Sequence, residues 1–400
     1  MTGTAADVLA RCATLGEISE EPDRLTRRVA TPALARAGDV VAGWMEDAGM
    51  TTRRDAVGNV VGRYGPGERP LVLGSHLDTV PNAGTFDGPL GIVAATAVVE
   101  RLAAGGPQPS CPVEVVAFAD EEGTRFGTSY LGSAAYVGAF EPAWLDHVDA
   151  EGITLRDAIR ASGGEPDAAV DVRPPDLAGY LEIHIEQGPV LEREGLPVGV
   201  VTAIAGQTRA RIVLTGEAGH AGTLPMDARH DALAAAAEAV LAVERRGRSE
   251  PGLVATVGAL ALSPNVGNVV PGEVRMLLDL RHADDGVRRR TAEEVRAKVE
   301  GIAAARGVDA GWTTRYETPA AVLDATLCLR LAAAVRELGL PVRELVSGAG
   351  HDAVILSRIC PAAMLFVRCA EGISHDPRES VSEADVAVAL DVLERAVRAS

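Results

Sequence analysis

Basic residues are scarce in this sequence of 400 residues: 38 lysines and arginines stand against 56 aspartates and glutamates, which gives a formal net charge of −18. The acidic residues are spread along the chain rather than gathered in a tail. Binding to nucleic acid or to an anionic membrane surface is therefore electrostatically disfavoured, and we expect neither as a partner. A small anionic substrate would need a local cationic pocket.

Long apolar runs and a secretory leader are missing as well. The longest clean apolar run, LGIVAATAVV, is too short to cross a bilayer. The N-terminal stretch has neither a basic start nor an unbroken apolar core. We therefore predict a cytoplasmic protein.

Cysteines are few, and their pattern excludes two kinds of scaffold. They are odd in number, scattered, and include no C-x-x-C pair, which argues against a disulfide framework and against a thiolate zinc site. We expect these five residues to be small buried apolar side chains: Cys12, Cys111, Cys328, Cys360 and Cys369.

The order of the apolar segments predicts an α/β protein of two domains. Residues 1–205 alternate helical and strand-like segments, which is typical of a mixed, mostly parallel sheet with helices on its faces. Residues 206–317 change to a β-α-β-β-α-β order, that of a ferredoxin-like α+β unit. Residues 318–400 resume the alternation of helical and strand-like segments seen in residues 1–205. We therefore expect one domain of 1–205 and 318–400, with 206–317 inserted into it.

Polar side chains follow the predicted apolar strand PLVL. His76 emerges at its C-terminal end in GSHLDTV, and Asp78 can hydrogen-bond the ring nitrogen of His76 that does not bind a metal. Asp87, in TFDGPLG, lies at a turn directly before a helix, where its two oxygens can bridge two cations. Such strand ends are where α/β sheets place their sites.

Further ligand types follow other strands. Glu121 and Glu122 come directly after VEVVAFA; one of these diverging carboxylates can bind a metal while the other faces a water, and the residues alone leave open which does which. His184 lies on the polar face of the period-two strand GYLEIHI, and His375 lies in a loop beside an acidic residue. A lone His-x-Asp or a run of acids is commonly a surface feature. One dinuclear site explains all of these loops together, with ligands that suit zinc or manganese, and also cobalt or nickel.

Eight motifs in order carry a resemblance that covers essentially the whole chain: GSHLDTV, TFDGPLG, DEEGTRFG, HIEQGP, GHAGTLPM, NVVPGEV, GAGHDA and GISHDP. The chain resembles the zinc amidohydrolases related to carboxypeptidase G and the aminoacylases. Within them it is most similar to the branch of N-carbamoyl-L-amino-acid hydrolases, allantoate amidohydrolase and ureidoglycolate hydrolase. The resemblance implies two divalent metal ions per subunit and a homodimer, with the inserted domain acting in dimerisation and as a lid.

The resemblance also implies which metal ion each ligand would bind. His76 and His184 would bind one metal ion, Glu122 and His375 the other, and Asp87 both. His184 stands where peptidase relatives typically carry a carboxylate, and this favours the carbamoyl branch.

Two further residues would assist catalysis. By the same resemblance, Asp78 would orient its histidine and Glu121 would be the general base, which takes a proton from the attacking water and passes it to the leaving nitrogen. The oxyanion needs a donor besides metal, and His220 in GHAGTLPM is the candidate. A turn histidine is the competing interpretation of His220.

Substrate capture is expected from the inserted domain. Arg281 ends the strand EVRMLLDLR, and its guanidinium can hold a carboxylate through two parallel hydrogen bonds. Asn268 and Gln207 would supply amide contacts by the family pattern, although Asn268 also suits an ordinary turn and Gln207 a domain junction. His351, in GAGHDA, either lines the pocket or hydrogen-bonds within its glycine-rich turn.

These residues together predict a hydrolase of a ureido C–N bond that releases ammonia and carbon dioxide from a small carboxylate substrate. Allantoate is the first expected substrate and an N-carbamoyl-L-amino acid the second. Leu224 and the segment GTSYLGSAAYVG depart from the family pattern near the expected pocket, so they bear on substrate identity. An N-acyl-amino-acid deacylase or peptidase, and an inert metal-binding protein, are the remaining alternatives; the glutamate base argues against the last.

Overall fold

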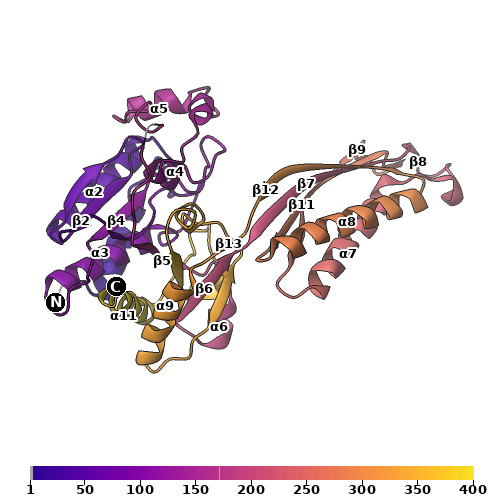
Figure 1. The fold of residues 1–400 in the computed structure, drawn as a ribbon. Coiled ribbons are helices and arrows are strands. Elements are labelled where there is room, and N and C mark those ends of the chain that lie inside the picture. The colour runs from indigo at the N-terminus through magenta and orange to yellow at the C-terminus, as the bar shows by residue number, and fades with distance from the viewer. Residues whose placement is uncertain (1–2, 171) are drawn as a thin grey trace. The chain divides into compact units, whose positions relative to one another are not determined.

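The computed structural model describes residues 3–170 and 172–400, and the chain divides into two compact units (Figure 1). The first unit comprises Met1–Thr202 and Leu323–Ser400, and the second comprises Ala203–Val322. The boundaries expected from the sequence, after residues 205 and 317, differ from these by a few residues. They differ because the second unit also takes in the end of one connecting strand, residues 203–204, and a short strand at 321–322.

A mixed sheet is the centre of the first unit, and in the described part of the chain it has nine strands. Its order is β1-β2-β4-β3-β5-β15-β6-β13, with β14 also paired to β6. The central strands β4, β3, β5 and β15 are mutually parallel, while the strands on either side pair antiparallel. The strands are β1 Thr51–Arg54, β2 Val60–Tyr64, β3 Leu71–His76, β4 Val113–Phe118, β5 Gly179–Ile185, β6 Val198–Ile204, β13 Ala321–Val322, β14 Glu344–Ser347 and β15 Ala362–Val367.

Helices flank this sheet, as Figure 1 shows. Helix α3 packs on β3, β4 and β5, while α9, α10 and α11 pack on β15. Every residue of β3, β4, β5 and β15 is buried, so these strands are covered on both faces, as parallel strands normally are. The helices are α1 Ala5–Gly16, α2 Pro32–Asp47, α3 Pro89–Ala103, α4 Leu131–Val137, α5 Leu155–Ala161, α6 Val190–Glu194, α9 Ala325–Glu337, α10 Ala353–Leu356 and α11 Glu383–Arg398.

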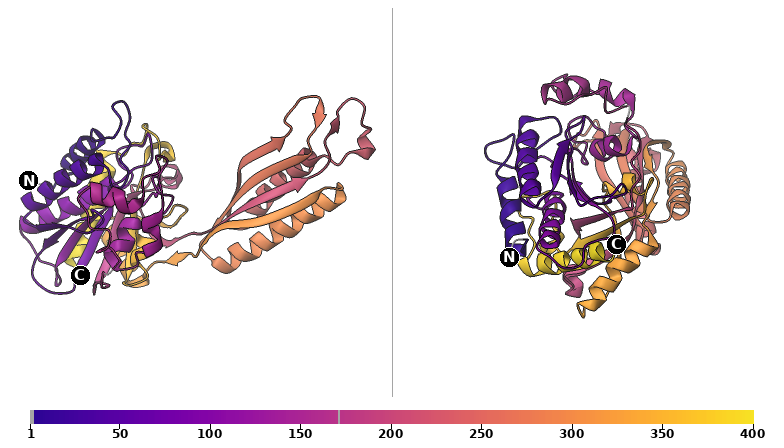
Figure 2. Two further views of the ribbon diagram at one scale, coloured as in Figure 1. Left: turned by 90° about the horizontal axis from the view of Figure 1, so that it is seen from above. Right: turned by 60° about the vertical axis from the view of Figure 1, so that its left-hand side comes forward.

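The second unit is an antiparallel sheet of order β12-β7-β11-β9 with helices α7 and α8 packed on it (Figure 2). Along β11, residues alternate between buried and exposed because one face lies under the helices and the other faces solvent. The element order is β-α-β-β-α-β, with the short pair β8 and β10 added. The elements are β7 Gly206–Thr215, β8 Gly219–His220, α7 Ala232–Ser249, β9 Val254–Ser263, β10 Val269–Val270, β11 Glu273–His282, α8 Asp285–Ala305 and β12 Asp309–Thr318.

The core of the second unit consists of small and branched apolar residues. Alanines on α7 let this helix approach the sheet closely, and they face Ile212, Leu214, Met276 and Leu278. In the described residues, no helix is both long and apolar enough to cross a membrane.

Candidate metal centre and active site

Two histidine rings and one carboxylate meet at the C-terminal ends of the parallel strands. His76 ends β3, His184 lies near the end of β5, and Asp87 precedes α3. The Nε2 atoms of His76 and His184 lie 3.3 and 3.2 Å from Asp87 Oδ1, and 3.5 Å from each other. Both rings are only 1% exposed. Three possible metal ligands therefore converge on one buried point.

The backbone fixes which nitrogen of each ring faces this point. His76 Nδ1 lies 3.1 Å from the backbone carbonyl of Asp78, and His184 Nδ1 lies 3.0 Å from that of Ile185. A carbonyl only accepts hydrogen bonds, so Nδ1 carries the proton and the neutral ring presents its Nε2 lone pair. Two lone pairs and a carboxylate oxygen then face one another, an arrangement that a cation would stabilise.

The second oxygen of Asp87 belongs to a second group of ligand types. His375 Nε2 lies 3.4 Å from Asp87 Oδ2 and 3.2 Å from Glu122 Oε1. Hydrogen bonds with Asp87 and Glu122 raise the pKa of His375 to about 10. Each group, His76-Asp87-His184 and Asp87-Glu122-His375, has ligand atoms within 4.8 Å of one another. The donor set fits two divalent cations that share one carboxylate.

Glu121 lies next to this centre in a different environment from Glu122. Burial first, and then the charge of Glu122, raise the pKa of Glu121 well above its ordinary value. Glu121 also forms a group of ligand atoms with His76 and Glu122. A carboxylate whose protonated form is favoured, beside a metal centre, is suited to accept and return a proton.

The Asp78 carboxylate contacts both the backbone of the Glu121–Glu122 pair and the ring of His76. Its Oδ1 accepts the Glu121 backbone N–H at 2.9 Å and its Oδ2 accepts that of Glu122 at 3.2 Å. Its Oδ1 also lies 3.4 Å from His76 Nδ1. The Asp78 carboxylate therefore fixes the backbone of the glutamate pair in addition to facing the histidine ring.

His351 packs behind the ligand histidines. Its Nε2 lies 2.8 Å from Ser347 Oγ, within the same glycine-rich turn, and its ring stands edge-on to His184 with 4.5 Å between centroids. Burial, and then the charge of His184, lower the pKa of His351 well below its ordinary value. The neutral ring of His351 therefore packs against the ring of His184.

The four predicted residues of the inserted segment all lie in the second unit, where they form two pairs. Gln207 and Arg281 are cross-strand partners on β7 and β11. His220 ends β8, which pairs antiparallel with β10, and the Ala221 N–H donates to the backbone carbonyl of Asn268, the residue before β10. Eight strand positions, roughly 26 Å, separate Glu273 from Arg281 on β11, and the β8/β10 pair adjoins the Glu273 end, so the two pairs lie far apart in the second unit.

Two of these side chains, those of Arg281 and His220, already have partners. Arg281 donates to both oxygens of Asp279, at 2.8 and 3.0 Å, and Arg209 donates to the same carboxylate. Burial would raise the pKa of Asp279, but hydrogen bonds from Arg281 and Arg209 lower it below the ordinary value. His220 Nδ1 accepts the Gly222 N–H at 3.1 Å, so in the neutral ring the proton lies on Nε2, where it can be donated.

Three residues around Asp87 were not predicted from the sequence. Gln187 Nε2 donates to Asp87 Oδ2 at 2.8 Å, and Ser374 Oγ donates to the same oxygen. Glu379 Oε1 accepts the backbone N–H groups of Phe86 and Asp87 at 2.7 and 2.9 Å. Gln187 and Ser374 stand inside quoted motifs next to ligand residues, but Glu379 is distant in sequence and gives no signal of its own.

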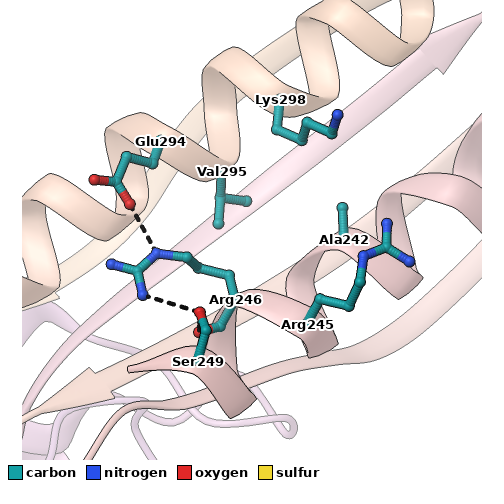
Figure 3. A pocket seen from close by; sticks show the side chains of 7 residues that line it. All are labelled: Ala242, Arg245, Arg246, Ser249, Glu294, Val295 and Lys298. Atoms are coloured by element: carbon teal, nitrogen blue, oxygen red, sulfur yellow. Dashed lines mark hydrogen bonds and ion pairs between the residues drawn. The ribbon is translucent and has the colours of Figure 1, made fainter. Parts of the chain in front are cut away.

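A separate groove of about 330 Å³ lies between α7 and α8 in the second unit (Figure 3). Arg246 is fixed there by ion pairing to Glu294, at 2.7 Å, while Arg245 and Lys298 also line the groove. None of the predicted site residues lines it. Its one hydroxyl, Ser249, and its one carboxylate, Glu294, are both paired with Arg246, and we assign the groove no part in the chemistry.

Comparison with known proteins identifies the class that this fold and site define. The chain belongs to peptidase family M20/M25/M40, whose family model matches residues 72–399. This confirms the resemblance to metal-dependent amidohydrolases inferred from the motifs, and the chain is a hydrolase acting on C–N bonds.

Individual relatives are similar to this chain over most of their length. The chain is 42% identical to the "N-carbamoyl-L-amino acid amidohydrolase" of Geobacillus stearothermophilus, over 95% of this chain and 94% of that protein. It is 40% identical to the "Probable allantoate deiminase" of Oryza sativa subsp. japonica, over 95% and 85%. A solved structure, an "Amidase, hydantoinase/carbamoylase family" from Burkholderia multivorans, superposes with a TM-score of 0.93 at 33% identity, covering 100% of this chain and 98% of that one.

Proposed function

We propose that this protein is a dinuclear-metal hydrolase that cleaves a ureido C–N bond of a small carboxylate substrate and releases ammonia and carbon dioxide. The observation that carries the proposal is the arrangement around Asp87, with two histidine nitrogens on Oδ1 and a histidine and a glutamate by Oδ2. Zinc or manganese are the first candidates, and cobalt or nickel suit the same ligands.

The residues of the chain have distinct tasks in this reaction. His76, His184, Asp87, Glu122 and His375 would hold the ions. Two such ions, when bound, lower the pKa of water and polarise the ureido carbonyl.

Proton transfer is assigned to Glu121. Its carboxylate takes a proton from the attacking water and then donates that proton to the leaving nitrogen. Asp78 keeps Glu121 in place by accepting its backbone N–H.

Allantoate is the substrate we propose first, and the rice relative's name supports it. A second candidate, an N-carbamoyl-L-amino acid, is favoured by the name and the 42% identity of the Geobacillus relative. Both compounds carry a ureido group and a carboxylate, so the same centre serves either. The two substrates differ in what surrounds the carbon between those groups.

We further propose that the protein is a homodimer in which the second unit provides substrate contacts. Gln207 and Arg281 would hold the substrate carboxylate and amide, and Asn268 and His220 would contact the ureido group and its oxyanion. Because these pairs lie near opposite ends of β11, one copy of the second unit reaches a single small substrate with only one pair. The other pair would come from a partner subunit, as the family resemblance implies.

Ammonia release tests the proposal. The purified protein, loaded with manganese or zinc, is offered allantoate, several N-carbamoyl-L-amino acids and the matching N-acetyl-L-amino acids. Ammonia from allantoate or from the carbamoyl compounds supports the proposal and ranks the two substrates. Hydrolysis of the N-acetyl compounds alone would indicate a deacylase instead. No hydrolysis of any of the three kinds of compound would contradict the proposal.

A further inference from the structure

Gln187 follows strand β5 and lies directly against the shared carboxylate of the metal centre. Its backbone adopts the left-handed region, with φ of 56°, which is uncommon for a residue other than glycine. This conformation accompanies a side chain whose Nε2 donates to Asp87 Oδ2 at 2.8 Å and to Ser374 Oγ at 3.1 Å. Residues held in such backbone conformations are concentrated at functional sites, where the surrounding structure maintains them.

The other end of this amide has no partner. Gln187 Oε1 is buried, and it accepts no hydrogen bond from any residue that the structure describes. Turning the amide around would not satisfy it, because Oε1 would then face the oxygen of Asp87 and two acceptors would repel. The Gln187 amide therefore contacts the Asp87 carboxylate through its nitrogen and holds an unpaired acceptor, Oε1, on its other side. A buried acceptor without a donor is unfavourable, so a native protein that keeps one calls for an explanation.

We infer that Gln187 Oε1 accepts a hydrogen bond from the terminal amino group of the substrate's ureido function. This inference rests on the proposed function, and it names the residue that selects a ureido group over an N-acyl group. The ureido amino group has two N–H donors, whereas the corresponding hydrogen of a formyl group or methyl of an acetyl group has none. Asp87 and Glu122 are engaged as ligand types and Glu121 is needed for proton transfer, so Gln187 is the neutral acceptor beside them.

Discrimination follows from the unpaired oxygen itself. A ureido substrate supplies the missing donor, while an N-formyl or N-acetyl analogue covers Oε1 and leaves it unsatisfied. A site built around a polar substrate group rejects an analogue that lacks this group more strongly than an apolar pocket rejects a small addition. The acceptor therefore works against deacylase activity at the same centre.

The experiment compares substrate pairs that differ only in the group facing Gln187. One pair is N-carbamoyl-L-alanine and N-formyl-L-alanine, and the other is allantoate and its bis-formamido analogue. For each pair the ratio of kcat/KM values is measured in the wild type, Gln187→Met and Ser374→Ala. Methionine keeps the length of the side chain but has no comparable acceptor. Ser374→Ala removes a hydrogen bond to Asp87 and one that the Gln187 NH₂ group donates, but it leaves the acceptor Oε1 in place, so it is the control for the donor end of the amide.

We expect the preference for the ureido member to fall roughly tenfold in Gln187→Met, the effect of losing one hydrogen bond, and to stay unchanged in Ser374→Ala even if both of its rates drop. Because each ratio is measured on one preparation, a partly unfolded or partly loaded sample does not alter it. Gln187→Glu separates the two ends of the amide, since it keeps an acceptor oxygen but loses both donors. It should retain the preference; a preference lost in both Gln187 variants would assign the residue to positioning Asp87 and overturn the inference.

Binding gives a readout independent of turnover. In the metal-loaded Glu121→Ala background, calorimetry should show that Gln187→Met weakens binding of N-carbamoyl-L-alanine and leaves binding of N-formyl-L-alanine unchanged. An unchanged preference in every Gln187 variant would overturn this inference while the proposed function stands. A wild type that prefers the formyl member of both pairs would overturn both, so the two failures are distinguishable.

Discussion

At the scale of single residues, the adjacent pair Glu121 and Glu122 shows how one backbone segment can present two carboxylates for the two tasks that we propose. Both N–H groups are held by the two oxygens of Asp78, so the segment is rigid although the two side chains diverge. The Tyr130 N–H donates to the Glu121 carbonyl at 3.0 Å and fixes the other side of the segment. The pair is therefore positioned by hydrogen bonds to its backbone, which leaves both carboxylates available for chemistry.

Replacing Glu121 with glutamine should remove turnover but keep the metal centre. Glutamine has the same shape and cannot take up the proton, and general acid–base catalysis contributes roughly 10²- to 10⁴-fold in rate. We expect kcat to fall by about that factor, with the metal content by elemental analysis close to that of the wild type. Turnover at the wild-type rate in Glu121→Gln would contradict the assignment of the base.

Asp78→Asn should weaken metal binding as well as catalysis. An asparagine oxygen can accept one of the two backbone N–H groups, but its NH₂ then opposes the other. Loss of such supporting contacts typically lowers metal affinity or activity by roughly 10- to 100-fold. Competition with a chelator measures the affinity. Asp376→Asn, at a half-buried acid that follows His375 and pairs with Arg378, is the control expected to change it little.

Metal binding should strengthen as pH rises from 6 to 9. The carboxylates of Asp87 and Glu122 raise the pKa of His375 to about 10, so in the metal-free protein this ring is protonated throughout that range. Binding a cation requires the neutral ring, and each binding event therefore releases a proton. Calorimetry in two buffers of different ionisation enthalpy counts the released protons; a count of zero at pH 7 would exclude His375 as a ligand.

At the scale of elements, α8 is joined to the start of β7 by a buried guanidinium. Arg288 is completely buried and donates to the Gln207 carbonyl at 3.0 Å, to the Thr208 hydroxyl, and to Asp285 and Glu317 at 3.0 and 3.2 Å. It therefore fixes the backbone of a residue that we assign to substrate contact.

Arg288→Leu should destabilise the protein, because the buried Gln207 carbonyl and Thr208 hydroxyl lose their donor, whereas the side chains of Asp285 and Glu317 still reach solvent. Leaving a buried polar group without its partner costs roughly 1–3 kcal/mol for each group. The free energy of unfolding from denaturant titration measures the loss. Arg289→Ala is the matched control: its ion pair with the same Glu317 is exposed, and such pairs contribute at most about 1 kcal/mol. Equal losses in the two variants would contradict the assigned role of Arg288.

The elements themselves could largely be predicted from the sequence, since their periodicity is strong. The β-α-β-β-α-β order expected over 206–317, for example, is the order β7, α7, β9, β11, α8 and β12. The central parallel strands also follow from their apolar runs. The antiparallel flanks of the sheet do not, because pairing between strands distant in sequence has no local signal.

The residues that support the expected metal ligands were less predictable from the sequence than the ligands themselves. His76, Asp87 and His184 stand at strand ends next to glycine or proline, where the sequence itself marks them. Glu379 supports the Asp87 backbone from nearly three hundred residues further along the chain, within an ordinary polar segment. Only the folded chain shows that contact.

At the scale of the whole molecule, charge is divided unequally between the two units. Residues 203–322 contain as many acidic as basic residues, so the formal charge of −18 lies entirely in the first unit. A neutral second unit can associate with its copy without direct repulsion, which supports the proposed homodimer.

The same division predicts how association responds to salt. If two chains associate through their second units, the remaining opposition is repulsion between two highly acidic first units, and salt screens it. We expect the dimer to persist or strengthen from 50 to 500 mM sodium chloride in sedimentation equilibrium. Dissociation as salt increases would indicate an interface built on ion pairs instead.

The position of β15 has a consequence for biosynthesis. This strand is made late, after the entire second unit, yet it lies between β5 and β6 and pairs with both. A nascent chain that has emerged only as far as residue 360 therefore lacks a central strand of its sheet, and it also lacks His375. The second unit can fold while the first remains an open sheet with exposed strand edges. Hydrolytic competence thus arises only after translation has passed His375, so products that terminate before this residue stay inert.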